Sequence, residues 1–163
     1  MRLNESVPYE GATPQQVFEL ICDEGFRDDV CEKVHAVSHD VTVERDGDTA
    51  KVTITRVMPA DVPDFIKKIT GETVEVVQTE KWARPDADGS RTGTVEVRIT
   101  GQPASMTGKT AVRAATGGAT LSVDGDVTVK IPLLGKRFEP ELANAIIAAL
   151  RTEAAEGAAR LRR

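Results

Sequence analysis

The stretch FEPELANAIIAALRTEAAEGAARL, residues 138–161, decides the fold of this chain. Its large apolar side chains recur every four residues, which is the spacing of one face of an α-helix. They are Phe138, Leu142, Ile146 and Leu150, with Ile147 beside them. Glutamates open the segment and arginines close it, so both ends complement the helix dipole. A helix of this length is on the order of 35 Å long, which is enough to cross a small domain.

Upstream of this helix the apolar residues alternate with polar ones, which is the period of a β-strand. Strands are predicted over residues 2–10, 37–43, 52–58, 73–84, 92–100, 104–115 and 119–131. Turn sequences such as Asp46-Gly47 separate neighbouring strands, so the sheet is expected to be antiparallel. Asp124-Gly125-Asp126 interrupts the last strand and is interpreted as a bulge or a bend.

Short helices are predicted near the N-terminus and in the middle of the chain. Thr13 is a good N-cap with Pro14 in the first turn, and a second short helix is predicted over residues 24–33. Residues 61–69 are expected to form a short helix or a covering loop. The predicted order is β-α-α-β(5-6)-α, an α+β fold in which a curved antiparallel sheet of six to seven strands wraps around the long C-terminal helix. One domain is expected over residues 1–163.

Composition and charge narrow the classes of function. The chain has 163 residues, 40% of them hydrophobic, and a net charge of -5, so nucleic acid is not expected as a partner. No stretch approaches the roughly 20 apolar residues that span a bilayer, and the N-terminus lacks the apolar core of a signal peptide. A cytoplasmic location is therefore expected. The two cysteines, Cys22 and Cys31, match no metal-binding spacing and are expected to be buried free thiols.

The predicted order of elements, with Pro-Leu-Leu-Gly-Lys-Arg-Phe-Glu at residues 132–139 leading into the last helix, resembles the START-like superfamily. This superfamily is also called helix-grip or polyketide cyclase/dehydrase-like, and the nearest resemblance is to an uncharacterised bacterial branch. The similarity covers essentially the whole chain. It implies a cavity between the helix and the sheet that holds lipids or other apolar compounds. It implies no shared catalytic residues, because some relatives are enzymes and others are carriers or receptors.

The sequence contains no complete motif for catalysis, nucleotide binding or metal binding. Gly108-Lys109-Thr110 ends like a phosphate-binding loop, but Pro103 stands where the first glycine is required. His35 and His39 would lie roughly 13 Å apart on a strand, too far for one metal ion. No cofactor or metal is therefore predicted, and the sequence leaves open whether the protein is an enzyme.

A few polar side chains fall on the strand face that core residues otherwise occupy, and they are the candidates for a ligand site. They are His39, Arg56, Gln78 and Glu80, with Trp82 on the same face. If they point inward, Arg56 and Glu80 could neutralise each other or hold a polar end of a ligand. If they lie near strand ends, they reach solvent instead. Trp82 and Val97 are expected to be either cavity wall or ordinary core, and Ile146 and Leu150, on the apolar stripe of the helix, are further candidates for the wall.

These residues are compatible with three kinds of function. The first hypothesis is non-catalytic binding of an apolar or lipid-like small molecule with one polar end. The alternative is a cyclase or dehydratase in which Glu80, Arg56 or His39 supplies acid or base. The third is a protein-interaction domain whose interior is filled, against which a cavity above about 300 Å³ would weigh. The oligomeric state is not predicted.

Overall fold

The computed structural model describes all 163 residues and contains seven strands and four helices. In chain order they are β1 (Arg2–Glu10), α1 (Pro14–Ile21), α2 (Glu24–Lys33), β2 (Ser38–Asp46), β3 (Thr49–Pro59), α3 (Asp64–Thr70), β4 (Thr73–Trp82), β5 (Arg91–Ile99), β6 (Ala104–Ala115), β7 (Gly118–Val129) and α4 (Gly135–Leu161). The predicted α+β order is confirmed. No helix combines the length and the hydropathy needed to cross a membrane.

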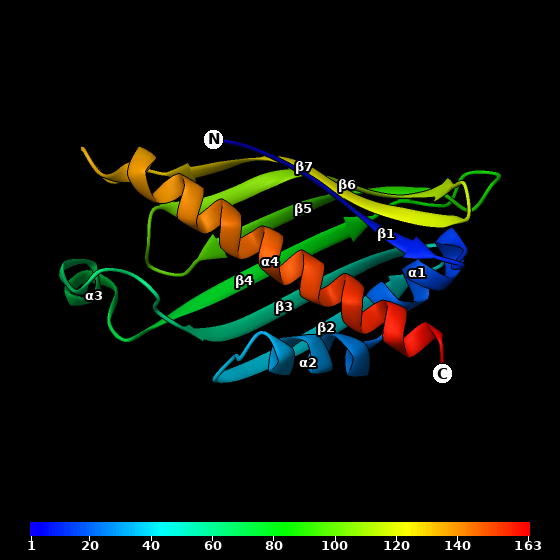
Figure 1. Cartoon of the computed structure of the whole chain (residues 1–163), viewed down its shortest axis with the longest axis horizontal. Helices are drawn as coiled ribbons and strands as arrows, with labels where there is room; N and C mark the ends of the chain where they lie inside the picture. The colour runs from blue at the N-terminus through cyan, green and yellow to red at the C-terminus, as the bar shows by residue number, and fades with distance from the viewer.

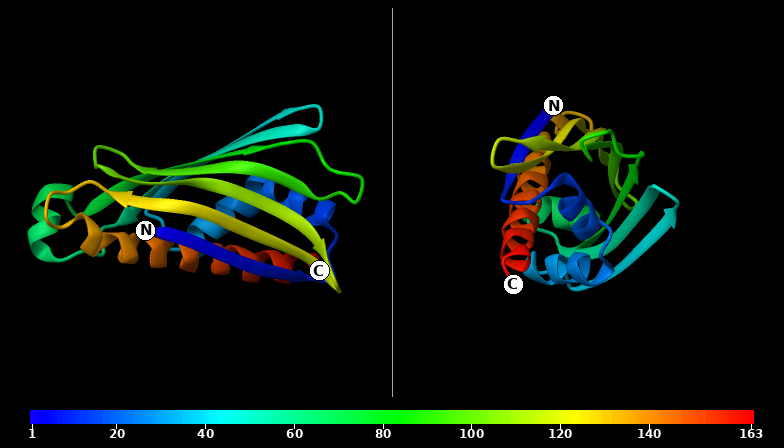
Figure 2. Two further views of the ribbon diagram at one scale, coloured as in Figure 1. Left: turned by 90° about the horizontal axis from the view of Figure 1, so that it is seen from above. Right: turned by 90° about the vertical axis from the view of Figure 1, so that its right-hand side faces the viewer.

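All seven strands belong to one antiparallel sheet in the order β1-β7-β6-β5-β4-β3-β2. Strands β2 to β7 pair with their neighbours in sequence, as consecutive hairpins require. The first strand pairs with the last, so β1 and β2 form the two edges. Figure 1 shows the strands crossing behind α4, and the end-on view in Figure 2 shows the sheet curving around it.

Of the bulge or bend predicted at Asp124-Gly125-Asp126, the bulge is not present. Gly125 pairs without interruption with Leu3 on one side and Gly108 on the other. A Cβ atom on Gly125 would lie 2.6 Å from the carbonyl oxygen of Thr107, and one on Gly108 would lie 2.3 Å from that of Asp124. The glycine pair therefore serves close approach of two backbones within a regular strand, which is the other use of a glycine in a sheet.

Helix α4 begins three residues before the predicted start at Phe138. The amide of Gly135 donates to the carbonyl oxygen of Ile131 at 2.8 Å, so the helix follows directly on the turn after β7. Pro140 consequently lies inside the helix, beyond its first turn. The helix then crosses the concave side of the sheet and packs against β1, β7 and α2.

The largest core cluster lies under the C-terminal half of α4, where α1 and α2 close one end of the curved sheet. Phe18 and Phe26 are completely buried there. Trp82 meets Phe18 edge to face, with ring centroids 6.1 Å apart, and the guanidinium of Arg91 lies 3.6 Å from the centroid of the same ring. We call this region the closed end. A smaller cluster under the N-terminal half of α4 includes Val97 and Met106.

Candidate ligand cavity

The space between α4 and the sheet is open at the end away from α1 and α2. A groove of about 330 Å³ lies there, and 13 of its 19 lining residues are hydrophobic. Its walls come from the N-terminal half of α4, from the region of α3 and from strands β3 to β7. They include Met58, Ile66, Val76, Ile99, Phe138 and Leu142. We call this the outer groove. Its volume lies at the low end of the range for small-molecule sites.

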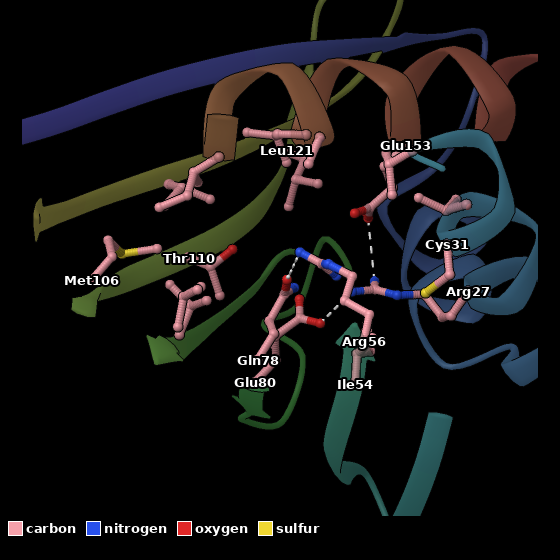
Figure 3. A pocket seen from close by; sticks show the side chains of 18 residues that line it. Arg27, Cys31, Ile54, Arg56, Gln78, Glu80, Met106, Thr110, Leu121 and Glu153 are labelled. Atoms are coloured by element: carbon pink, nitrogen blue, oxygen red, sulfur yellow. Dashed lines mark hydrogen bonds and ion pairs between the residues drawn. The ribbon is translucent and has the colours of Figure 1, made fainter. Parts of the chain in front are cut away.

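A second, smaller space lies deeper, toward the closed end. This inner cavity has a volume of about 60 Å³ and is lined mainly by apolar side chains from strands β3 to β7, α2 and α4. Its polar lining residues are Arg27, Arg56, Gln78, Glu80, Thr110 and Glu153. Figure 3 shows the charged ones gathered at one side of the cavity. Apolar walls with a few converging polar groups are typical of a ligand site.

Consecutive inward-facing residues connect the two spaces. On β3, Arg56 lines the inner cavity and Met58 lines the outer groove. On α4, Ile146 lines the inner cavity and Leu142, one turn earlier, lines the groove. Because such pairs lie next to each other on one face, the groove and the cavity lie end to end along the sheet, and we call the two together the channel.

Three ion-paired side chains line the inner cavity on the side that faces the closed end. They are Arg27, Glu80 and Glu153, and we call them the ion triad. The guanidinium of Arg27, from α2, donates to Oε2 of Glu80 on β4 at 2.6 Å and to Oε1 of Glu153 on α4 at 3.2 Å. The side chain of Arg27 is only 1% exposed, and both carboxylates are nearly as deeply buried. The triad therefore joins the helical layer to the sheet through three buried charges (Figure 3).

Burial and the attraction of the opposite charge act in opposite directions on the pKa values of Arg27 and Glu80. Burial lowers the pKa of Arg27, but the attraction of Glu153 and Glu80 is larger in sum and leaves it raised. Burial raises the pKa of Glu80, and Arg27 and a hydrogen bond from Gln78 only partly offset this effect. Arg27 thus stays charged, whereas the ionised form of Glu80 is held at a cost.

Arg56 differs from Arg27 in having no carboxylate partner. No Asp or Glu oxygen lies within 4.0 Å of its side-chain nitrogens, and its Nη2 donates to Oε1 of Gln78 at 3.2 Å. Cys31 also lines the cavity. Burial lowers the pKa of Arg56, and the attractions of Cys31 and Glu153 do not fully compensate. Arg56 is therefore a half-buried cation that lines the cavity and has no ionic partner.

Six of the eight predicted site residues lie along the inner cavity. They are Arg56, Gln78, Glu80, Val97, Ile146 and Leu150. Their contact with a ligand stays a prediction. The expected pairing of Arg56 with Glu80 is wrong, because Glu80 is bound by Arg27 and Arg56 by Gln78.

The other two predicted residues, His39 and Trp82, do not line the cavity. Nε2 of His39 lies 3.3 Å from Oδ1 of Asp28, a contact between β2 and α2. Trp82 is 2% exposed and fills the closed end against Phe18. Both follow the inward parity, but α2 lies against β2 at His39 and α1 packs against Trp82, so each side chain meets protein.

Sequence reasoning missed Arg27 and Glu153. A signal for Glu153 was available, because it lies three residues after Leu150 and continues the apolar stripe of α4. Arg27 lies four residues before Cys31, on the same face of α2. A charged residue on an otherwise buried helix face indicates a buried ionic partner. Which partner it finds depends on the packing of α2 and α4.

Solved structures with the same fold cover nearly the whole chain. A Thermus thermophilus protein, TTHA0849, aligns with a TM-score of 0.61 and 14% identity over 98% of this chain and 96% of its own. A STAR-related lipid transfer protein of Xanthomonas axonopodis aligns at 0.60 and 12% identity, covering 98% and 85%. The Zhui aromatase/cyclase of a Streptomyces species aligns at 0.58 and 13% identity, covering 100% and 94%. The resemblance to START-like proteins is confirmed at the level of the fold.

Comparison of the sequence, as distinct from the fold, assigns a family. No protein of curated function matches the chain. A family model described as "Protein of unknown function (DUF2505)" matches residues 4–161, which is almost the entire chain. The chain therefore belongs to the DUF2505 family, and its structure has the helix-grip fold of START-like proteins.

Proposed function

We propose that this protein binds an apolar or lipid-like small molecule with one polar end in the channel between α4 and the sheet. The observation that carries the proposal is the outer groove, with its volume of about 330 Å³ and mainly hydrophobic lining. The large apolar side chains of Phe138 and Leu142 are left half-buried along it. An apolar ligand would remove this surface from water, at roughly 25 cal/mol per Å².

The relatives of the same fold support this class of ligand. One is a lipid transfer protein by name, and another is an aromatase/cyclase. The volume of the groove also weighs against the hypothesis of a fully packed interior.

Binding is better supported than the alternative of a cyclase or dehydratase. Of the three proposed acid or base groups, Glu80 is bound by Arg27 and His39 lies outside the cavity beside Asp28. An arginine remains protonated throughout the physiological range, which makes Arg56 a poor proton carrier and a good charge partner.

The proposal is tested by calorimetric titration with decanol, a simple apolar chain with a polar end, against a variant with a blocked groove. Ala145 lines the groove and Ala148, one turn later, does not, and both are exposed alanines of α4. We expect Ala145→Trp to weaken decanol binding roughly 10-fold or more by occupying the groove, which corresponds to about 1.4 kcal/mol.

The matched control Ala148→Trp should bind decanol like the wild type. Native mass spectrometry of the purified protein should in addition detect a lipid-like species that the wild type retains and Ala145→Trp loses. Equal weakening of decanol binding by both tryptophan variants, or a wild type that neither binds decanol nor retains a lipid-like species, would contradict the proposal.

A further inference from the structure

Two arginines line the inner cavity. One of them is ion-paired with carboxylates of the protein and the other is not. Arg27 contacts two carboxylates, Glu80 and Glu153. Arg56 contacts the neutral amide of Gln78 and forms no ion pair. A guanidinium has five N–H donors, so most of those on Arg56 have no carboxylate or amide acceptor. A cation in such a site is stabilised by an anion that brings charge and hydrogen-bond acceptors together.

From this difference we propose that the polar end of the ligand is a carboxylate, bound by Arg56 with Gln78 holding the guanidinium in place. The inference rests on the proposed function, and it names the class of ligand: an apolar acid. Oxygens of a carboxylate match the planar fork of a guanidinium, which can donate to both at once.

The position of Arg56 along the channel fits a chain-like acid. Met58 follows Arg56 on the same face of β3 and already belongs to the outer groove, and Val76 precedes Gln78 on the same face of the antiparallel β4 and lies in the groove as well. A carboxylate at Arg56 would therefore place the apolar remainder directly into the hydrophobic groove. The small inner volume of about 60 Å³ leaves space at Arg56 for a compact head group.

The surrounding charges favour a single negative charge on the ligand. Glu80 and Glu153 lie at the same end of the cavity, and each would repel an incoming anion. A carboxylate carries one charge, whereas a phosphate monoester carries close to two at neutral pH. The repulsion is smaller for the carboxylate. Arg27 neutralises part of the charge of both glutamates and further reduces it.

The experiment compares decanoate, decanol and decyl phosphate by calorimetric titration of the wild type and of Arg56→Gln. A charge-assisted hydrogen-bonded pair corresponds to about a 10-fold to 100-fold difference in affinity. We expect decanoate to bind the wild type tighter than decanol by this factor, and decyl phosphate to bind less tightly than decanoate. Arg56→Gln should lose the advantage of decanoate over decanol.

The matched control is Arg98→Gln, because Arg98 is an exposed arginine that pairs with Glu96 on β5 outside the cavity. It should leave all three affinities unchanged. Equal binding of decanol and decanoate to the wild type, or tighter binding of decyl phosphate, would overturn the carboxylate assignment and leave the proposed function standing. Binding of none of the three would overturn both. The wild-type comparison decides the question even if Arg56→Gln fails to fold.

Discussion

The two halves of α4 differ in what their side chains contact. In the C-terminal half the buried residues include the small Ala154 and Gly157, which let the helix approach β1 closely. In the N-terminal half the large side chains of Phe138 and Leu142 remain half-buried. Small buried residues occur in both halves, since Gly135 and Ala143 are buried as well, but only the N-terminal half presents large side chains to the outer groove. The difference teaches that the cavity depends on unequal packing along a single helix.

The largest effect is expected at the ion triad, which separates the closed end from the channel. Arg27→Met leaves Glu80 and Glu153 buried without a counter-charge and should lower the free energy of unfolding by about 3–5 kcal/mol. Urea denaturation of the wild type and of Arg27→Met measures this loss. Replacing all three residues by apolar ones of similar volume should recover most of the loss.

A surface ion pair of the same helices provides the control for the triad. Arg160 on α4 contacts Asp29 on α2 at 2.9 Å, and both side chains are partly exposed. Arg160→Met should therefore cost less than about 1 kcal/mol. A similar loss for both arginines would show that the buried triad does not distinguish the two regions.

Truncation of two isoleucines compares the packing at the two ends directly. Ile21 is 1% exposed at the closed end, and Ile146 is half-buried beside the cavity. Ile21→Ala should cost about 2–5 kcal/mol, because it opens a void in a dense core. Ile146→Ala only enlarges an existing space and should cost distinctly less. Equal losses in thermal or urea unfolding would mean that the channel is packed as tightly as the core.

Enlarging a side chain gives the converse comparison. A Cβ atom on Gly157 would lie 2.7 Å from Cε1 of Tyr9. Gly157→Val should therefore destabilise the protein by about 1–3 kcal/mol through overpacking. Ala145→Val, in the wall of the outer groove, should stay within about 1 kcal/mol of the wild type, because the added methyl groups enter open space. If Gly157→Val were as stable as the wild type, the packing of α4 against β1 at this position would be shown to accommodate a larger side chain.

The smallest expected effect is a pH dependence of the free energy of unfolding that arises at Glu80, in the ion triad. Because burial raises the pKa of Glu80 above its ordinary value of 4.5, the folded state binds this proton more tightly than the unfolded state. The contribution of Glu80 to stability is then present in full below pH 4.5 and is lost as the pH rises through the folded-state pKa. The stability of the wild type relative to Glu80→Gln should accordingly fall from pH 4.5 upward, as measured by urea denaturation at several pH values. A relative stability that rises with pH would show that the attraction of Arg27 dominates.

Much of the fold could be predicted because its signals are local. The alternation of side chains placed the seven strands, and the four-residue spacing placed α4, to within a few residues of their bounds. The same parity placed Arg56, Gln78 and Glu80 on the inner face. Parity does not distinguish a residue beside a cavity from one in the core, so it left Trp82 as a candidate for either, and the packing of α1 against it decides for the core.

What the sequence by itself determined is the order of elements, the antiparallel sheet and the face on which each strand residue lies, because these follow from periods of two and 3.6 residues and from turn chemistry. Only the tertiary structure decided which charges meet. Arg27 binds Glu80 across 53 positions of the chain and Glu153 across 126. Those contacts depend on the curvature of the sheet and the angle at which α4 crosses it, and no local pattern encodes either. The same geometry leaves Arg56 without an ionic partner and the channel open.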